Sequence, residues 1–185
     1  EYQSTQATVF YPSVVSARYA VKEAKWNDVA IQIFYHPRHD YNIDTMTRGV
    51  QQSLEVFSKE FGEYPFSYVR IIEFPRFSRF AQSFPGTIAY SEAIGFIARL
   101  SDSEDEVNYP FFVTAHEMAH QWWPHQTSVS ATKGANMLSE TLSQYSALVV
   151  MEHDLGMEEM RLFLRYGLDR YLTGRGAERD REVPL

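Results

Sequence analysis

The sequence predicts an α+β fold, with a short mixed sheet built from the first half of the chain and helices built from the second half. Two observations support this prediction. Before residue 98, β-branched and aromatic residues are grouped in short extended runs. From Asn108 onward, apolar residues recur at the spacing of helices. The 185 residues are enough to bury the core of one domain, with part of a second.

Strands are predicted in the first 35 residues. Residues 8–11 and 13–21 are β-branched and aromatic, and residues 29–35 alternate apolar with polar side chains. Asn27-Asp28 is typical of a turn between two strands. The sequence His36-Pro-Arg-His39 follows the last strand, and its proline indicates a surface turn; metal binding by the two histidines is the alternative.

A helix is predicted between Asp44, as its N-cap, and Gly62, at its C-terminal end. Its apolar side chains recur at helical spacing and would form one core-facing stripe: Met46, Val50, Leu54, Phe57 and Phe61. A strand is expected at 68–74. The aromatic residues 77–84 are expected to be irregular, and residues 87–98 to form a further extended segment.

The composition limits the classes of function. A formal net charge of −7 without a basic patch argues against a nucleic-acid partner. Because the chain has no cysteine, any metal must be held by histidines and carboxylates. It contains no run of about 18 apolar residues that could span a membrane and no secretory signal, and its start at Glu1 indicates a soluble piece of a longer protein. The acidic run 101–106 is read as a solvated loop, with binding of a basic partner as the alternative.

The chemistry is concentrated in His116-Glu117-Met-Ala-His120, a His-Glu-x-x-His pattern that binds zinc when it lies on a helix. Asn108 as a cap and Pro110 in the first turn predict such a helix, which would end at Pro124. The two histidines are one turn apart, so their rings project from the same face and can hold one ion. Glu117 lies one step round the helix, where it can reach a water on that ion. The alternative is a helix whose histidines only hydrogen-bond in the core.

Two candidates exist for the third ligand. His125 follows His120 closely, but the Gly and His that the metzincin pattern requires after the second histidine are not at their positions. Glu140 lies on the next predicted helix, 135–153, which a further helix at 157–172 follows. A carboxylate from that helix completes the two-His, one-Glu set of thermolysin-like zinc enzymes, so we predict Glu140 as the ligand.

These residues resemble a known family. Residues 116–123, His-Glu-Met-Ala-His-Gln-Trp-Trp, and 139–145, Ser-Glu-Thr-Leu-Ser-Gln-Tyr, are similar to the aminopeptidase-N-like gluzincins. That family reads His-Glu-Leu-Ala-His-Gln-Trp-Phe and then Asn-Glu-Gly-Phe-Ala-Ser-Tyr. More narrowly, the whole chain resembles the peptidase-like module fused to bacterial ABC-type transporter permeases. The resemblance implies a thermolysin-like zincin catalytic domain at 43–185, preceded at 1–42 by the end of a β domain.

The resemblance also implies a mechanism. Zn²⁺ would be held by His116, His120 and Glu140, and Glu117 would be the general base in hydrolysis of a peptide substrate by a zinc-activated water. The substrate would add as a strand to the segment 87–97. In the full-length protein, the domain would be tethered to a membrane permease.

One departure from the family concerns the strand that lines the site. Family members carry Gly-x-Met-Glu-Asn there, and its Glu grips the free amino group of the substrate. We take the corresponding stretch to be 86–92, with Gly86, Tyr90 and Glu92 as the substrate-binding candidates. Tyr90 stands where the Glu should be, and Glu92 would serve only after a shift of two residues, which keeps the same strand face. Exopeptidase specificity therefore stays open.

Other departures concern chain length. The connection between His120 and Glu140 is one residue longer than in the family, which a loop tolerates. The catalytic tyrosine of the family is expected after Leu185, so the nearer tyrosines are read as packing residues: Tyr145, Tyr166 and Tyr171. These departures leave open a zinc-binding but catalytically inactive module that binds peptides or proteins for a membrane transporter. A metal-free interaction domain is a third reading.

Overall fold

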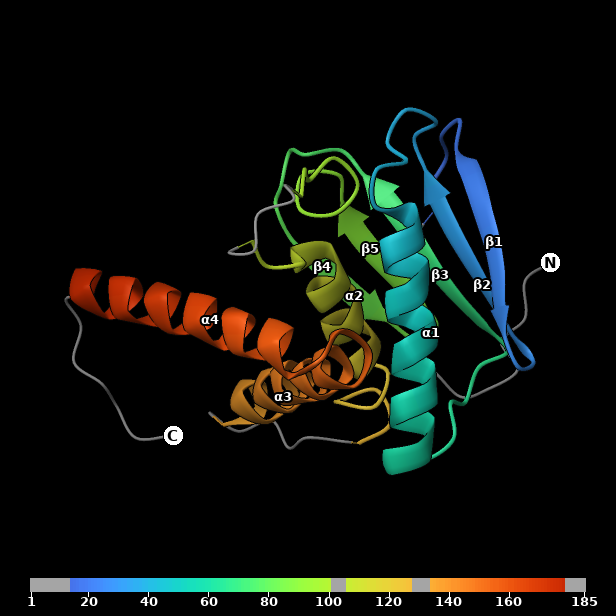
Figure 1. Cartoon of the computed structure of the whole chain (residues 1–185). Coiled ribbons are helices and arrows are strands. Elements are labelled where there is room, and N and C mark those ends of the chain that lie inside the picture. Colours follow the sequence, from blue (N-terminus) through green and yellow to red (C-terminus); the bar gives the residue numbers. More distant parts are fainter. Residues whose placement is uncertain (1–13, 101–105, 128–133, 179–185) are drawn as a thin grey trace.

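The computed structural model describes residues 14–100, 106–127 and 134–178, which form a five-stranded mixed sheet and four helices (Figure 1). The strands are β1 (Ala20–Trp26), β2 (Val29–Tyr35), β3 (Tyr68–Phe74), β4 (Ala81–Phe84) and β5 (Thr87–Ser91). The helices are α1 (Ile43–Glu60), α2 (Tyr109–Ala119), α3 (Ala135–Leu155) and α4 (Met157–Ala177). Figure 1 shows α1 and α2 on one face of the sheet and α4 projecting away from the body. Of the helices in these ranges, none combines the length and apolarity needed to cross a lipid bilayer.

The sheet has the strand order β1-β2-β3-β5-β4. Strands β2, β3 and β5 run parallel, whereas β1 and β4 run antiparallel to their neighbours and form the two edges. Strand β2 pairs directly with β3, although β1 and β2 lie within the segment 1–42 that is expected to be the end of a preceding β domain. Both strands belong to the same sheet as the strands that follow α1.

The strands predicted near the start of the chain are confirmed in part. Residues 8–11 lie outside the described residues. Residue 13 also lies outside them, and of the predicted residues 14–21 only Ala20 and Val21 belong to β1, which continues to Trp26. The predicted turn is confirmed at Asn27, whose φ is 48°. The bounds of β2 and β3 agree with the prediction.

Helix α1 begins earlier than predicted. Asn42 occupies the N-cap position and Asp44 lies in the first turn, so the predicted cap at Asp44 is wrong by two residues. The Asn42 side chain does not cap the helix; it donates to the carbonyl oxygens of Gly95 (2.6 Å) and Ala98 (2.7 Å). The apolar stripe is confirmed, with Phe61 only partly buried and four members fully buried: Met46, Val50, Leu54 and Phe57. Gly62 follows the helix at φ 112°.

The segment between β3 and α2 departs most from the prediction. Residues 81–84, expected to be irregular, form the edge strand β4, which pairs with β5 through a turn at Gly86 (φ 67°). The extended segment expected at 87–98 stops at Ser91 and continues as turns. Strand β5 stops there because its partner β3 ends at Phe74, and the next residue, Pro75, has no N–H to donate to a ladder.

The helices of the second half start where they were predicted. Asn108 caps α2 by accepting a hydrogen bond from the backbone N–H of Phe111 (3.2 Å). The apolar side chains of α2 and of the turn that follows it are buried, among them Phe112, Ala115, Met118, Ala119 and Trp122. Helix α2 ends at Ala119 and not at Pro124, which makes His120 its C-cap. Helix α3 ends two residues later than predicted, at Leu155, and Gly156 follows it at φ 96°.

Helix α4 is longer than predicted, and most of its large apolar side chains are exposed. Phe163 stacks on Phe112 with ring centroids 3.7 Å apart, but Tyr171 and Leu172 are more than half exposed. Figure 1 shows the reason, because only the beginning of α4 lies against the body. The packing role predicted for Tyr171 is therefore wrong, and so is that of Tyr145, which is also more than half exposed.

Gly95 provides a test of this packing. A Cβ added there would lie 2.2 Å from Cε1 of Tyr90 and 2.4 Å from Cε of Met46, both fully buried. We expect Gly95→Ala to destabilise the protein by about 1–3 kcal/mol, because the packed core must shift to admit the methyl group. Urea unfolding measures this change.

The matched control is Gly167→Ala on α4, where an added Cβ meets nothing within 4 Å. Its expected effect is a stabilisation of at most about 1 kcal/mol, from helix propensity alone. Equal midpoints for Gly95→Ala and the wild type would contradict the described packing around Tyr90.

Candidate metal centre

The end of α2 is anchored in the core, and this anchoring positions the His-Glu-x-x-His motif. His116 lies in the last turn and His120 at the C-cap. Trp122, which is almost fully buried, donates through its indole N–H to the carbonyl oxygen of Gly62 (2.9 Å). Trp123 donates to Oγ of Ser146 on α3 (3.3 Å). The turn after the two histidines is thus tied both to the end of α1 and to α3.

Three predicted ligands converge on one point. Nε2 of His116 lies 3.1 Å from Nε2 of His120 and 3.3 Å from Oε2 of Glu140. Nε2 of His120 lies 3.6 Å from Oε1 of Glu140. Two imidazole nitrogens and a carboxylate that approach this closely from two helices match the donor set of a tetrahedral zinc site with one open position. The side chain of Glu140 is 62% exposed, so the cluster opens to solvent on the side of α3.

The tautomer of His120 suits metal binding. Its Nδ1 lies 2.7 Å from the carbonyl oxygen of Trp123 and 3.0 Å from Oγ of Ser143 on α3. A proton on Nδ1 satisfies the carbonyl and leaves the lone pair of Nε2 facing Glu140. Such a hydrogen bond on the outer nitrogen is the usual support of a metal-bound histidine.

His116 is held in its neutral form. Burial, and secondly the neighbouring His120, keep the pKa of His116 well below its usual value. Its Nδ1 is buried without a hydrogen-bond partner among the described residues. Neutral imidazole is the form that binds a metal, so both histidines fit a zinc ion.

Glu117 lies beside this cluster without joining it. Its side chain is 5% exposed, and burial, followed by the charge of Glu140, raises its pKa to about 8. A hydrogen bond from the backbone of Ser83 opposes that rise. Its Oε2 has no hydrogen-bond partner within the part of the chain that the structure describes. The result is a buried carboxylate with a free oxygen, next to three potential metal ligands.

The edge strand β4 lies against this end of α2. Gln121, which is almost fully buried, donates to Oγ of Ser83 (2.5 Å) and to the carbonyl oxygen of Phe84 (2.9 Å). Its own Oε1 accepts from the backbone N–H of Gly86 (2.8 Å). Gln121 therefore clamps the β4–β5 hairpin to α2 and sets the backbone of Ser83 beside Glu117.

The predicted substrate residues do not gather at this site. Tyr90 is fully buried, and its hydroxyl group lies 3.4 Å from the carbonyl oxygen of Pro110, so it is a core residue. Glu92 belongs to a different cluster, with His39. Gly86 is connected to the motif through Gln121, and a Cβ there would lie 2.8 Å from the ring of Tyr68. The charge of Glu117 also acts on the buried hydroxyl group of Tyr90.

The strand assigned to the substrate is also wrong. Strand β5 has β3 on one side and β4 on the other, so it has no free edge for strand addition. The strand beside Glu117 is β4, whose residues Ala81–Phe84 include no carboxylate. The segment 87–97 was assigned from the resemblance to the family, and β4 was not expected because residues 77–84 were predicted to be irregular.

Three residues of the site were not found from the sequence: Ser83, Gln121 and Ser143. Ser143 has a usable signal, because it lies three residues after Glu140 and therefore on the same face of α3. The other two become recognisable only once β4 is placed beside α2. His125, the rejected third ligand, is not part of the cluster and lies near the backbone of Ser83.

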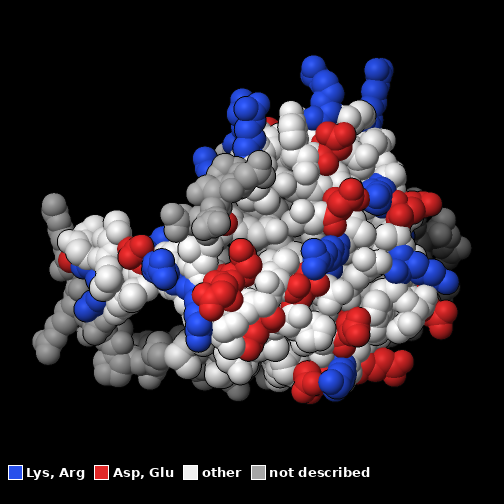
Figure 2. Space-filling view, viewed as in Figure 1, with Lys and Arg blue, Asp and Glu red and all other residues white. Residues whose placement is uncertain are grey.

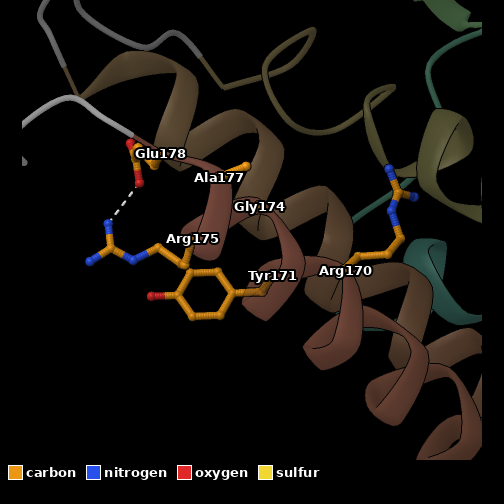
Figure 3. Close-up of a pocket in the computed structure, with 6 residues that line it drawn as sticks. All are labelled: Arg170, Tyr171, Gly174, Arg175, Ala177 and Glu178. Carbon is orange, nitrogen blue, oxygen red and sulfur yellow. Dashed lines mark hydrogen bonds and ion pairs between the residues drawn. The ribbon is translucent and has the colours of Figure 1, made fainter.

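A hollow at the far end of α4 has no comparable chemistry (Figure 3). Its lining residues come from this one helix and the residue that follows it. Arg175 pairs with Glu178 (2.7 Å), and Arg170 points away from that pair, toward the ring of Tyr166. With its one carboxylate paired and no histidine, this hollow is not a candidate for the site.

No protein-family model matches the chain, and no curated protein matches it closely enough to assign a family.

Glu140 tests the metal centre. We expect Glu140→Ala to weaken Zn²⁺ binding at this centre at least 100-fold, because only two of three protein ligands remain. Competition against a zinc-sensitive fluorescent chelator measures the affinity. The control is Glu152→Ala, an exposed carboxylate on the same helix, which should bind zinc as the wild type does. Equal affinities for the two variants would exclude Glu140 as a ligand.

Glu117 predicts a specific pH dependence of stability in metal-free protein. Its folded pKa of about 8 lies above its ordinary value of 4.5, so the folded state holds the proton more tightly than the unfolded state. The contribution of Glu117 to the stability of the fold is therefore fully present below pH 4.5, and it is lost as the pH rises toward 8. Glu117→Gln should remove this loss and stabilise the metal-free fold at pH 8 by up to about 5 kcal/mol.

Urea unfolding of both proteins in the presence of a chelator, at pH 5 and pH 8, measures this difference. The gain from Glu117→Gln should be larger at pH 8 than at pH 5. A gain that is the same at both values would show that Glu117 has an ordinary pKa.

Proposed function

We propose that this chain is a zinc-dependent metallopeptidase domain of the thermolysin-like, aminopeptidase-N-like kind, which hydrolyses peptide bonds. The observation that carries the proposal is the convergence of His116, His120 and Glu140 beside the buried carboxylate of Glu117. The resemblance of residues 116–123 and 139–145 to that family supports it. When bound, Zn²⁺ would polarise the scissile carbonyl group and lower the pKa of a water molecule to about 7.

Glu117 is the general base in this proposal. It accepts the proton of the attacking water and returns it to the leaving amine, a role that needs a pKa close to the working pH. Its free Oε2 provides the acceptor, and the hydrogen bond from the backbone of Ser83 holds the carboxylate in place. Burial excludes competing water from the carboxylate.

The peptide binds along β4 in this proposal. An edge strand can accept an extended peptide as an additional strand, whereas β5 is paired on both sides. The backbone of Ser83 already interacts with Glu117 and with His125, so this part of β4 faces the reacting groups. Since Ala81–Phe84 includes no carboxylate to bind a free amino group, we expect cleavage that does not require a free N-terminus.

A second candidate function is a zinc-binding but catalytically inactive module that binds peptides or proteins for a membrane transporter. The same lack of a carboxylate on β4 favours it, because an aminopeptidase would need that anchor. Attachment to an ABC-type permease follows from the resemblance and would make the full-length protein membrane-associated. Zinc content does not separate the two candidates, because both hold the ion; turnover does.

The test is hydrolysis of an internally quenched peptide library by the zinc-loaded protein, with and without blocked N-termini. We expect activity on both peptide forms. Glu117→Gln should reduce the rate at least 100-fold while retaining zinc, because it removes the base but no ligand. Glu152→Gln, on the exposed side of α3, should be unaffected.

Different outcomes favour different functions. Equal rates for the wild type and Glu117→Gln would remove the enzymatic proposal. Bound zinc together with peptide binding but no cleavage would favour the inactive module. Cleavage only of peptides with a free N-terminus would indicate an exopeptidase. Its binding group for the substrate's amino group would then have to lie outside β4.

A further inference from the structure

A second group of potential metal ligands lies where the three parallel strands end. His39 follows β2, Glu73 lies near the end of β3, and Glu92 follows β5. Parallel strands bring their carboxyl ends to one edge, the edge at which open sheets commonly bind ligands. Figure 1 shows the three arrowheads side by side at the top of the molecule. One imidazole nitrogen and two carboxylate oxygens meet there within 4.8 Å of one another.

Glu73 is the centre of this cluster. It is 4% exposed, and its Oε1 lies 2.5 Å from Nδ1 of His39. Its Oε2 accepts a hydrogen bond from the backbone N–H of His36. Behind it, the hydroxyl group of Tyr19 donates to the backbone oxygen of Glu73 (2.8 Å). The carboxylate is therefore fixed in orientation, and one of its oxygens lies within 4.8 Å of a carboxylate oxygen of Glu92.

Glu92 completes the group from the other side. It is 18% exposed, and its Oε2 lies 3.8 Å from the same Nδ1 of His39. Figure 2 shows basic side chains projecting from this edge of the molecule. Over the rest of this face, acidic and basic side chains are intermixed. Arg76 pairs with Glu92 (Nε to Oε1, 3.7 Å), but its side chain is 71% exposed, which leaves the pair screened by solvent.

The cluster holds more carboxylates than histidines. Two carboxylates, one of them almost fully buried, share a single histidine. The cation paired with Glu92 is the exposed Arg76, and Arg38 and Arg99 line the hollow beside His39. A divalent cation between the three groups would neutralise both carboxylates, with the imidazole nitrogen of His39 as the third ligand.

We propose that His39, Glu73 and Glu92 form a second divalent-cation site, separate from the centre at His116 and suited to Zn²⁺. An imidazole nitrogen with two carboxylate oxygens is a donor set for zinc or manganese, whereas calcium and magnesium prefer oxygen alone. The hollow lined by Arg38, His39, Tyr41, Ile97 and Arg99 gives solvent access to His39. The proposal does not rest on the peptidase function.

The sequence His36-Pro-Arg-His39 then has two distinct roles. His39 is the ligand. His36 supports the turn through its backbone N–H, which donates to Glu73. Its Nδ1 accepts a hydrogen bond from the backbone N–H of Arg38 (3.2 Å), and its ring centroid lies 4.5 Å from that of His39. A bound ion would join the turn after β2, the end of β3 and the turn after β5, so it would stabilise the edge of the sheet.

Zinc stoichiometry tests the second site. Protein stripped with a chelator, reloaded with Zn²⁺ and freed of excess metal is expected to hold two zinc ions per chain by elemental analysis. Glu92→Gln should hold one, because it loses a ligand of the second site. His116→Ala should also hold one, retained by the second site, and the two substitutions together should hold none. Glu55→Gln, an exposed carboxylate on α1, is the matched control and should hold two.

The test variant changes Glu92 and not Glu73, because Glu73 is more deeply buried and its replacement would destabilise the fold. His39→Gln is the second variant, and circular dichroism confirms that each variant is folded. A single zinc in the wild type that His116→Ala abolishes would overturn the proposal, and so would an unchanged zinc content in both Glu92→Gln and His39→Gln. The cluster would then be an ion-pair network. Because His116→Ala leaves only the second site, a failure of the first centre would not obscure this result.

Discussion

The position of the metal-binding helix depends on its close contact with α1. An added Cβ at Gly49 of α1 would lie 3.1 Å from Cγ2 of Thr114 on α2, so the two helices meet almost backbone to backbone at this point. Phe111 and Ala115, on either side of Thr114, are fully buried. Because α2 is packed so tightly, the direction of its last turn is fixed, and with it the direction in which His116, Glu117 and His120 project.

From this fixed helix, buried polar contacts define the rest of the site. Gln121 holds β4 beside Glu117, and Ser143 connects His120 to α3, the helix that carries Glu140. A buried polar group that loses its partner costs about 1–3 kcal/mol, so each contact restricts the arrangement of the elements it joins. Glu117 is the exception, since it is buried with an oxygen left free. A free oxygen on a buried carboxylate is an unfavourable feature for stability and a useful one for proton transfer.

The two candidate metal clusters use the fold in different ways. The first takes its ligands from neighbouring turns of two helices, and one ligand, Glu140, is largely exposed, which suits a site with an open position. The second takes its ligands from the ends of three parallel strands and is mostly buried, which suits a structural ion. The sheet topology alone creates the second cluster, because its ligands are far apart along the chain. His39 and Glu73 are 34 positions apart, on either side of α1, and 18 residues lie between Glu73 and Glu92.

The sequence by itself determined what depends on neighbours along the chain. The helical spacing of His116 and His120, the cap at Asn108, the stripe on α1 and the bounds of β2 and β3 were all predictable, because turn chemistry and periodicity are local. Glu140 was predicted as a ligand because it lies on the next helix, and the structure brings it to the two histidines.

Only the tertiary structure decided which strand borders the site and which carboxylates meet. Residues 81–84 have a weak strand pattern and become β4 through pairing with β5, and β5 ends at Ser91 because β3 ends beside it. The grouping of His39, Glu73 and Glu92 depends on the parallel order of β2, β3 and β5, and local periodicity does not encode strand order. Contacts between distant segments are set by the packing of the whole core, and for that reason they became visible only in three dimensions.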